Sequence, residues 1–118
     1  MTKKRFDNHG TEFSLWLREQ PKVDSSIGYT ATNIDYVWRN YKTGDWMIIE
    51  EKCFMAKPER WQKEIFEIVN QCCKHDPKFR GFHLIQFKNT SPEYGEIFLD
   101  GKEISEANLI EFLQFKFS

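Results

Sequence analysis

Two runs of alternating apolar and polar residues, separated by a short polar segment, stand out in the first half of the chain. Residues 33–41 mix aromatic and β-branched side chains with polar ones, and residues 46–54 open with four apolar residues and continue into a charged stretch. Such runs are typical of half-buried β-strands. The segment 42–45 between them predicts a tight turn, because Gly44 can take a positive φ angle. We therefore expect an antiparallel hairpin.

Apolar residues recur at helical spacing in three further segments. Thr11 is a good N-cap residue, and the helix that it begins is expected to end at Pro21. A longer helix is predicted from Pro58, which suits the first position of a helix, to Lys74. Ser105 caps a final helix. We therefore expect one helix before the hairpin in the sequence, one after it, and one near the C-terminal end.

Three short runs predict further strands. Residues 27–30 add a strand before the hairpin, which gives a three-stranded antiparallel meander. Residues 81–87 follow the long helix and so can pair parallel to a central strand, and residues 96–99 predict an edge strand that turns at Asp100. The fold class expected is α+β, with a core of helix, meander, helix and strand followed by a C-terminal strand and helix.

Composition bounds the kind of protein. With 118 residues, 30% of them charged and 40% apolar, the chain suits a single domain over residues 1–118 with one modest core. No apolar run reaches the length of a membrane span, and residues 1–9 do not form a signal sequence, so we expect a cytoplasmic protein without membrane contacts. The three cysteines, two of them adjacent, suit neither a disulfide framework nor a zinc site.

Three charged residues of the hairpin are candidates for chemistry. Glu50 and Lys52 share a face of the second strand because side chains alternate. If residues 43–44 form a two-residue turn, Asp35 lies opposite Lys52, and all three side chains converge. A turn one residue longer or shorter puts Asp35 on the face of Glu51 instead. A purely structural ion pair between Asp35 and Lys52 is the alternative interpretation.

These residues resemble the signature of the PD-(D/E)XK nuclease superfamily. Ile34-Asp35 ends one strand and, after a short hairpin, an apolar run closes in Glu50-Glu51-Lys52, with Ile34 in place of the proline of the family name. The resemblance extends over the element order from Glu12 to Phe87. It implies a restriction-endonuclease-like α/β core in which Asp35, Glu50 and Lys52 carry out metal-dependent hydrolysis of phosphodiester bonds.

The resemblance also implies roles for individual residues. Asp35 and Glu50 would hold Mg²⁺ or Mn²⁺, and Lys52 would orient water or stabilise charge in the transition state. Glu12, in the first helix, matches the position of an acidic residue that faces the metal in this family; its alternative role is to complement the helix dipole. Gln71, with His75 one turn later, matches the Gln-x-x-x-Tyr pattern of nucleases similar to the RecB branch.

Charge is distributed unevenly along the chain. The net charge is −1, but residues 92–118 carry six acids and two bases, which leaves residues 1–91 with a net positive charge. A basic surface around an acidic centre suits an enzyme that acts on DNA, although a merely solvated surface is the alternative. The nucleic-acid-binding candidates lie on or next to the long helix: Lys57, Arg60, Lys63 and Lys74.

The resulting hypothesis is a metal-dependent DNA endonuclease. Resemblance to small stand-alone members suggests a phage-type or structure-specific enzyme, Holliday junction resolvases included, which would act as a homodimer. The main alternative is a catalytically inactive nuclease-fold module that binds nucleic acid or a protein partner. A structural α+β interaction domain requires the motif to be accidental.

Overall fold

The computed structural model describes residues 11–116, which divide into two compact units at Thr32. The first unit contains α1 (Glu12–Arg18) and two 3-10 turns, η1 (Pro21–Val23) and η2 (Ser25–Ile27). Thr11 caps α1 as predicted, because its Oγ1 accepts a hydrogen bond from the backbone N of Ser14 at 3.1 Å. The single domain expected from the chain length stays a prediction, and the two units are described separately.

The prediction of a strand at residues 27–30 is wrong. Asp24 caps η2 by accepting hydrogen bonds from the backbone N and the hydroxyl of Ser26, at 3.0 and 2.6 Å. Gly28 then ends the turn with a φ angle of 116°, a conformation that favours glycine. Local side-chain hydrogen bonds therefore outweigh the β propensity of this short run, and the three-stranded meander does not form.

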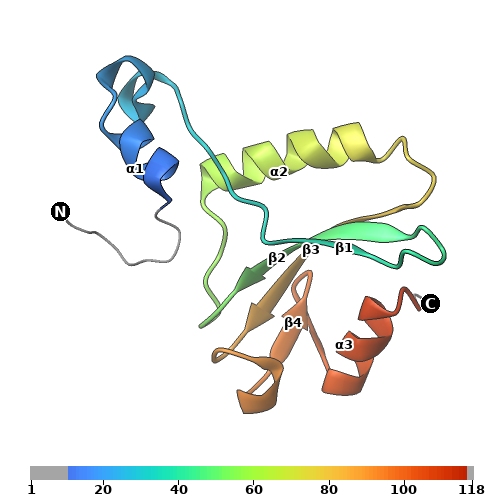
Figure 1. The fold of residues 1–118 in the computed structure, drawn as a ribbon. Helices are drawn as coiled ribbons and strands as arrows, with labels where there is room; N and C mark the ends of the chain where they lie inside the picture. The colour runs from blue at the N-terminus through green and yellow to red at the C-terminus, as the bar shows by residue number, and fades with distance from the viewer. Residues whose placement is uncertain (1–10, 117–118) are drawn as a thin grey trace. The chain divides into compact units, whose positions relative to one another are not determined.

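The second unit holds a five-stranded mixed sheet (Figure 1). Strand order follows the sequence, and the pairing of β2 with β3 is parallel whereas the others are antiparallel. The parallel pairing predicted for the strand after the long helix is confirmed. The strand predicted at the sheet edge is internal, since β5 pairs outside it. The elements are β1 (Tyr36–Arg39), β2 (Trp46–Lys52), α2 (Arg60–Cys73), β3 (Phe79–Phe87), η3 (Pro92–Tyr94), β4 (Ile97–Leu99), β5 (Lys102–Ile104) and α3 (Glu106–Leu113).

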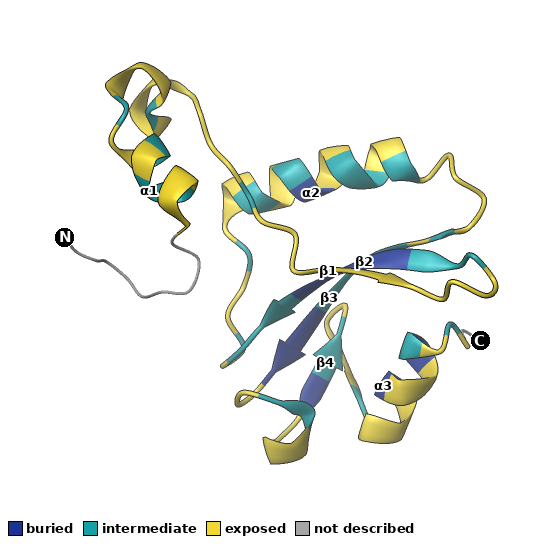
Figure 2. Ribbon diagram, in the orientation of Figure 1, coloured by how far each residue is buried: buried dark blue, intermediate teal, exposed yellow. Residues whose placement is uncertain are grey.

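A helix lies on each side of this sheet, so that the central strands are covered on both faces (Figures 1 and 2). On the α2 side, the rings of Phe66 and Phe82 pack with their centroids 4.5 Å apart. The main apolar core forms on the α3 side. Its buried residues are Met47, Ile49, Ile85, Phe87, Ile97, Leu109 and Phe112.

The register of the β1–β2 hairpin differs from the prediction by two residues. Val37 lies opposite Ile48, where the two-residue turn placed Glu50. The cause is a longer loop: the backbone N of Asn40 donates to the carbonyl of Asp45 at 2.9 Å, which leaves four residues between them. A shift of two residues keeps every side chain on its predicted face, so the convergence of the charged residues survives.

Within residues 11–116, no helix is both long and apolar enough to cross a lipid bilayer.

Candidate active site

The hairpin register places the Asp35 and Glu50 positions opposite each other. Tyr36 pairs with Ile49, and one step further along the same register brings Asp35 to Glu50. Asp35 is anchored there because its Oδ2 accepts a hydrogen bond from the backbone N of Glu51 at 2.9 Å. The edge position leaves Asp35 exposed, whereas Glu50 lies on a central strand beneath α2 and retains only 4% of its accessible surface. A buried and an exposed carboxylate thus meet on one face of the sheet.

Lys52 completes the cluster that was predicted from the sequence. Its Nζ lies 3.4 Å from Glu50 Oε2, and the side chain is 22% exposed. The structural alternative, an ion pair between Asp35 and Lys52, does not form within 4 Å, because Lys52 pairs with the buried carboxylate instead. The cluster therefore contains two carboxylates and one ammonium group, with Glu50 between the other two.

The environment of Glu50 is costly for its charged form. The pKa of Glu50 is raised from 4.5 to about 7, chiefly by burial and also by the negative charge of Asp35 and a hydrogen bond that protonated Glu50 shares with Asp35, while Lys52 partly offsets these effects. Glu50 Oε1 is buried and has no hydrogen-bond partner. Such a buried orphan acceptor costs free energy unless a cation or a proton compensates it.

The donor set fits magnesium or manganese bound in part by substrate and water. Among the described residues, no group of three or more His, Cys, Asp or Glu side chains converges to hold a metal ion. Two carboxylates do converge here, and Mg²⁺ is commonly held by one or two protein carboxylates, with waters and substrate phosphate oxygens as its other ligands. The unpartnered Oε1 of Glu50 is the oxygen that would bind such an ion.

Gln62 belongs to this cluster although the sequence analysis did not select it. Its Oε1 accepts a hydrogen bond from Lys52 Nζ at 3.5 Å and another from the backbone N of Glu59 at 2.8 Å. The first turn of α2 thereby fixes the position of the lysine. The Gln-x-x-x-aromatic spacing that pointed to Gln71 also occurs at Gln62 and Phe66, so this signal was present in the sequence.

The structure does not bring Gln71 to the cluster. Gln71 is exposed near the C-terminal end of α2, nine residues after Gln62, which corresponds to about 13 Å along the helix axis. His75 is exposed beyond the end of the helix. Spacing alone could not separate the two glutamines, because only the crossing of α2 over the sheet decides which of its turns lies above Lys52.

Glu12 is exposed at the first residue of α1, in the first unit. Its position in the first turn agrees with the dipole-complementing role. Its contribution to a metal site in the second unit stays a prediction.

All four basic residues proposed to bind nucleic acid are exposed. Lys57, Arg60 and Lys63 lie at the end of α2 that carries Gln62, whereas Lys74 lies at the other end. Arg60 is paired with Glu64 at 3.9 Å, an exposed contact that leaves it accessible.

A cavity of about 330 Å³ lies on the opposite face of the sheet from the acidic cluster. Aromatic and aliphatic side chains of β1, β2, β3 and α3 line most of it, and Glu51, which points away from Glu50, contributes a carboxylate. Tyr36 donates a hydrogen bond to Glu51 Oε1 at 3.1 Å, and this contact raises the pKa of the tyrosine. Asp35, Glu50 and Lys52 do not border this cavity.

Comparison of the chain with models of known families, with curated proteins and with solved structures finds no match. The chemistry of the acidic cluster therefore carries the functional inference.

The two glutamines of α2 give a direct test of how Lys52 is positioned. Gln62→Ala removes a helix-capping contact and the contact to Lys52, and we expect a loss of about 1 kcal/mol in stability. In the nuclease predicted from the sequence, DNA cleavage would also slow about tenfold, since a mobile lysine is less well placed. Gln71→Ala is the matched control and should leave both quantities at wild-type values. Urea denaturation and initial cleavage rates measure the two effects, and equal behaviour of both variants would contradict the role of Gln62.

Proposed function

We propose that this protein is a metal-dependent DNA endonuclease that hydrolyses phosphodiester bonds at the cluster of Asp35, Glu50 and Lys52. The observation that carries the proposal is the buried Glu50, which faces a second carboxylate and a lysine and keeps one oxygen without a partner. Burial, the neighbouring Asp35 and the unpartnered oxygen all disfavour the charged carboxylate, and Lys52 offsets them only in part, so an arrangement that served stability alone would not combine these features.

Each residue of the cluster has a chemical role that follows from its contacts. Asp35 Oδ2 is held by the backbone of Glu51, which leaves its Oδ1 available, and Glu50 Oε1 is available beside it. These two oxygens would hold Mg²⁺ or Mn²⁺. When bound, the ion supplies a Lewis acid that polarises the phosphodiester and acidifies a water molecule.

Lys52 would act on the reacting phosphate from the other side of Glu50, and Gln62 would position it. The ammonium group can stabilise the additional negative charge that develops as a nucleophile attacks phosphorus, and it can orient the attacking water. Gln62 holds this group by its contact of 3.5 Å. Because the side chain of Lys52 is 22% exposed, it is accessible to a substrate that approaches the sheet.

The order of elements supports a restriction-endonuclease-like fold as part of this proposal. An antiparallel pair ending in the Glu-x-Lys motif, a crossover helix and a parallel strand follow one another, and the crossover helix covers the motif. The chain departs from the expected pattern in lacking the third strand of the meander.

A panel of DNA forms tests the proposed activity. The wild-type chain should cleave at least one of plasmid, single-stranded and branched DNA in Mg²⁺ or Mn²⁺ and none in EDTA. Asp35→Asn should abolish cleavage and retain the wild-type circular dichroism spectrum, because the substitution keeps the shape of the side chain and its hydrogen bond to Glu51 while removing the charge. Retardation of DNA without cleavage in any divalent metal would support the inactive module instead.

A further inference from the structure

The loop between β1 and β2 and the loop before β3 meet at the end of the sheet remote from Glu50. The backbone N of Trp46 donates to the carbonyl of Lys78 at 3.1 Å, which joins the two loops. Arg80 on β3 reaches across to Asp45 at 2.7 Å. Side chains from both loops therefore form one surface, which includes residues 39–45 and 74–80.

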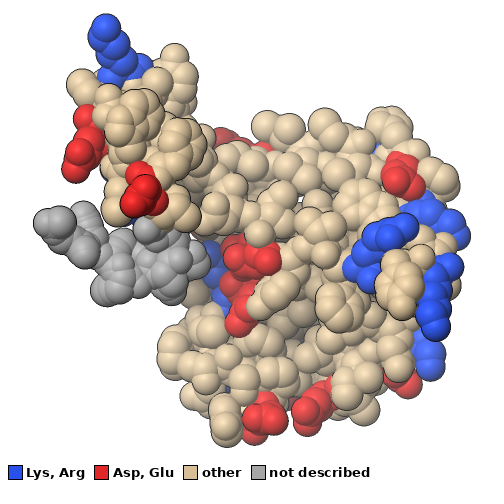
Figure 3. Space-filling view, in the orientation of Figure 1, with Lys and Arg blue, Asp and Glu red and all other residues tan. Residues whose placement is uncertain are grey.

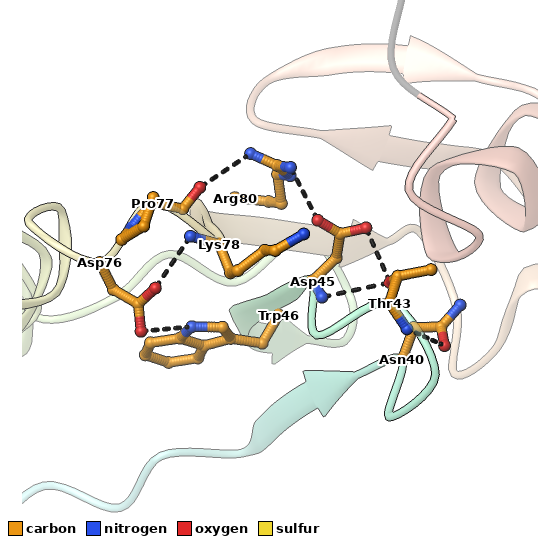
Figure 4. Close-up of polar contacts among 8 residues, drawn as sticks. All are labelled: Asn40, Thr43, Asp45, Trp46, Asp76, Pro77, Lys78 and Arg80. Carbon is orange, nitrogen blue, oxygen red and sulfur yellow. Dashed lines mark hydrogen bonds and ion pairs between the residues drawn. The ribbon is translucent and has the colours of Figure 1, made fainter.

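This surface is basic. It carries five lysines and arginines against two aspartates, and Figure 3 shows blue side chains gathered at this end of the sheet. Both aspartates have structural partners: Asp45 pairs with Arg80, and Asp76 accepts from Trp46 Nε1 and from the backbone N of Lys78 (Figure 4). Arg39, Lys42 and Lys78 are exposed, and no carboxylate of a described residue lies within 4 Å of their charged groups. Three cations are therefore available to a polyanion.

The same loop presents an aromatic ring to solvent. Tyr41 is 77% exposed. The loop around it is braced. Asn40 Oδ1 accepts a hydrogen bond from the backbone N of Lys42 at 2.9 Å. It accepts another from the backbone N of Thr43 at 3.3 Å, and Thr43 Oγ1 donates to Asp45 Oδ2 at 2.8 Å (Figure 4). A braced loop presents an exposed ring at little entropic cost on binding. Exposed aromatic rings next to cations are the elements with which proteins bind unpaired bases and the backbone that links them.

Strand β1 connects this surface to the acidic cluster. Asp35 directly precedes β1 and Arg39 is its last residue, so the two are separated by about 13 Å of extended chain. Strand β1 forms the edge of the sheet, and all four of its residues are exposed. A DNA strand lying along this edge would reach both places.

We propose that Arg39, Tyr41, Lys42 and Lys78 form a docking surface for DNA, in which the three cations bind backbone phosphates and Tyr41 stacks on an unpaired base. The inference rests on the proposed function, since it places this contact about 13 Å along β1 from the site proposed at Asp35 and Glu50. None of these four residues is among the basic residues predicted from the sequence to bind nucleic acid, although Lys74, one of that predicted set, lies on the same surface. The preferred substrate is accordingly DNA with a single-stranded segment next to the cleaved bond.

Binding of a fluorescent single-stranded oligonucleotide by the full chain in EDTA tests the proposal. With Asp35→Asn as the parent, Lys42→Ala combined with Lys78→Ala should weaken binding at least about tenfold and make the slope of log K against log salt less negative by about 1.4. Tyr41→Ala should weaken single-strand binding about tenfold without a change of slope and should leave duplex binding unchanged. Lys102→Ala, an exposed lysine on β5, is the control for loss of one positive charge and should bind as the parent does.

The docking surface would be overturned if the variant with Lys42 and Lys78 replaced binds with the affinity and salt dependence of its parent. Failure of the parent chain to bind DNA would overturn it as well. The outcome is separable from the nuclease proposal. Loss of binding in these variants together with a wild-type chain that never cleaves would refute the activity and keep the surface. If the wild-type chain cleaves DNA and its loop variants bind DNA as the parent does, the docking surface is refuted and the nuclease activity is kept.

Discussion

Replacement of Lys52 by alanine is expected to slow metal-dependent DNA cleavage by about 10²–10³-fold, the range found when one preorganised donor to a transition-state oxyanion is removed. The ammonium group of Lys52 lies 3.4 Å from Glu50 and 3.5 Å from Gln62, so its position is fixed before the substrate binds. Initial rates on the DNA form that the wild-type chain cleaves best measure the effect. Substrate affinity should change much less than the rate, because the charge is needed mainly as the phosphate reacts.

Lys102→Ala is the matched control, since it removes a positive charge from an exposed residue of β5 that has no proposed role in catalysis or DNA binding. It should cleave near the wild-type rate. Circular dichroism and thermal melting of both variants separate catalysis from folding. A Lys52→Ala chain that is folded and cleaves as fast as wild type would contradict the catalytic role and return Lys52 to a structural one.

Glu50→Gln is expected to stabilise the metal-free protein at pH 8 by up to about 3 kcal/mol, although it should abolish cleavage. The pKa of Glu50 is raised from 4.5 to about 7 in the folded chain, so the folded state holds a proton that the unfolded state has lost. The free energy of unfolding of the wild-type chain must then fall as pH rises from 4.5 to about 7 and stay low above it. Glutamine has no such proton to lose, so its stability should not fall in this window.

Urea denaturation at pH 5 and pH 8, in EDTA, measures this difference. Glu67→Gln, an exposed residue of α2, is the control and should follow the wild-type chain at both pH values. Addition of Mn²⁺ at pH 8 should stabilise the wild-type chain and not Glu50→Gln, because the ion binds the folded carboxylates. A variant less stable than wild type at pH 8 would show that the charged carboxylate is satisfied by the protein alone.

The hairpin shows why the convergence of Asp35, Glu50 and Lys52 could be predicted although the predicted register was wrong. The alternation of side chains fixes which residues share a face, and an error of two residues leaves that face unchanged. The error itself came from Asn40, whose side chain accepts two backbone hydrogen bonds and so holds a longer loop. Loop length depends on such individual contacts, which spacing does not reveal.

Other features of the site depend on tertiary contacts that the sequence pattern does not contain. Glu50 is buried on the face of the sheet that α2 covers, and the periodicity of α2 predicts its apolar face but not where that face lies on the sheet. The same crossing distinguishes Gln62 from Gln71. Near Gly28, short-range caps replaced a strand that propensity favoured.

The most direct test of the account is anomalous diffraction from crystals of the wild-type chain soaked with Mn²⁺ at pH 8, where Glu50 is ionised. We expect an anomalous peak within coordination distance of one carboxylate oxygen of Asp35 and one of Glu50. This peak should be absent from crystals of Glu50→Gln. Mn²⁺ bound elsewhere on the chain, with no density between these two carboxylates, would contradict it.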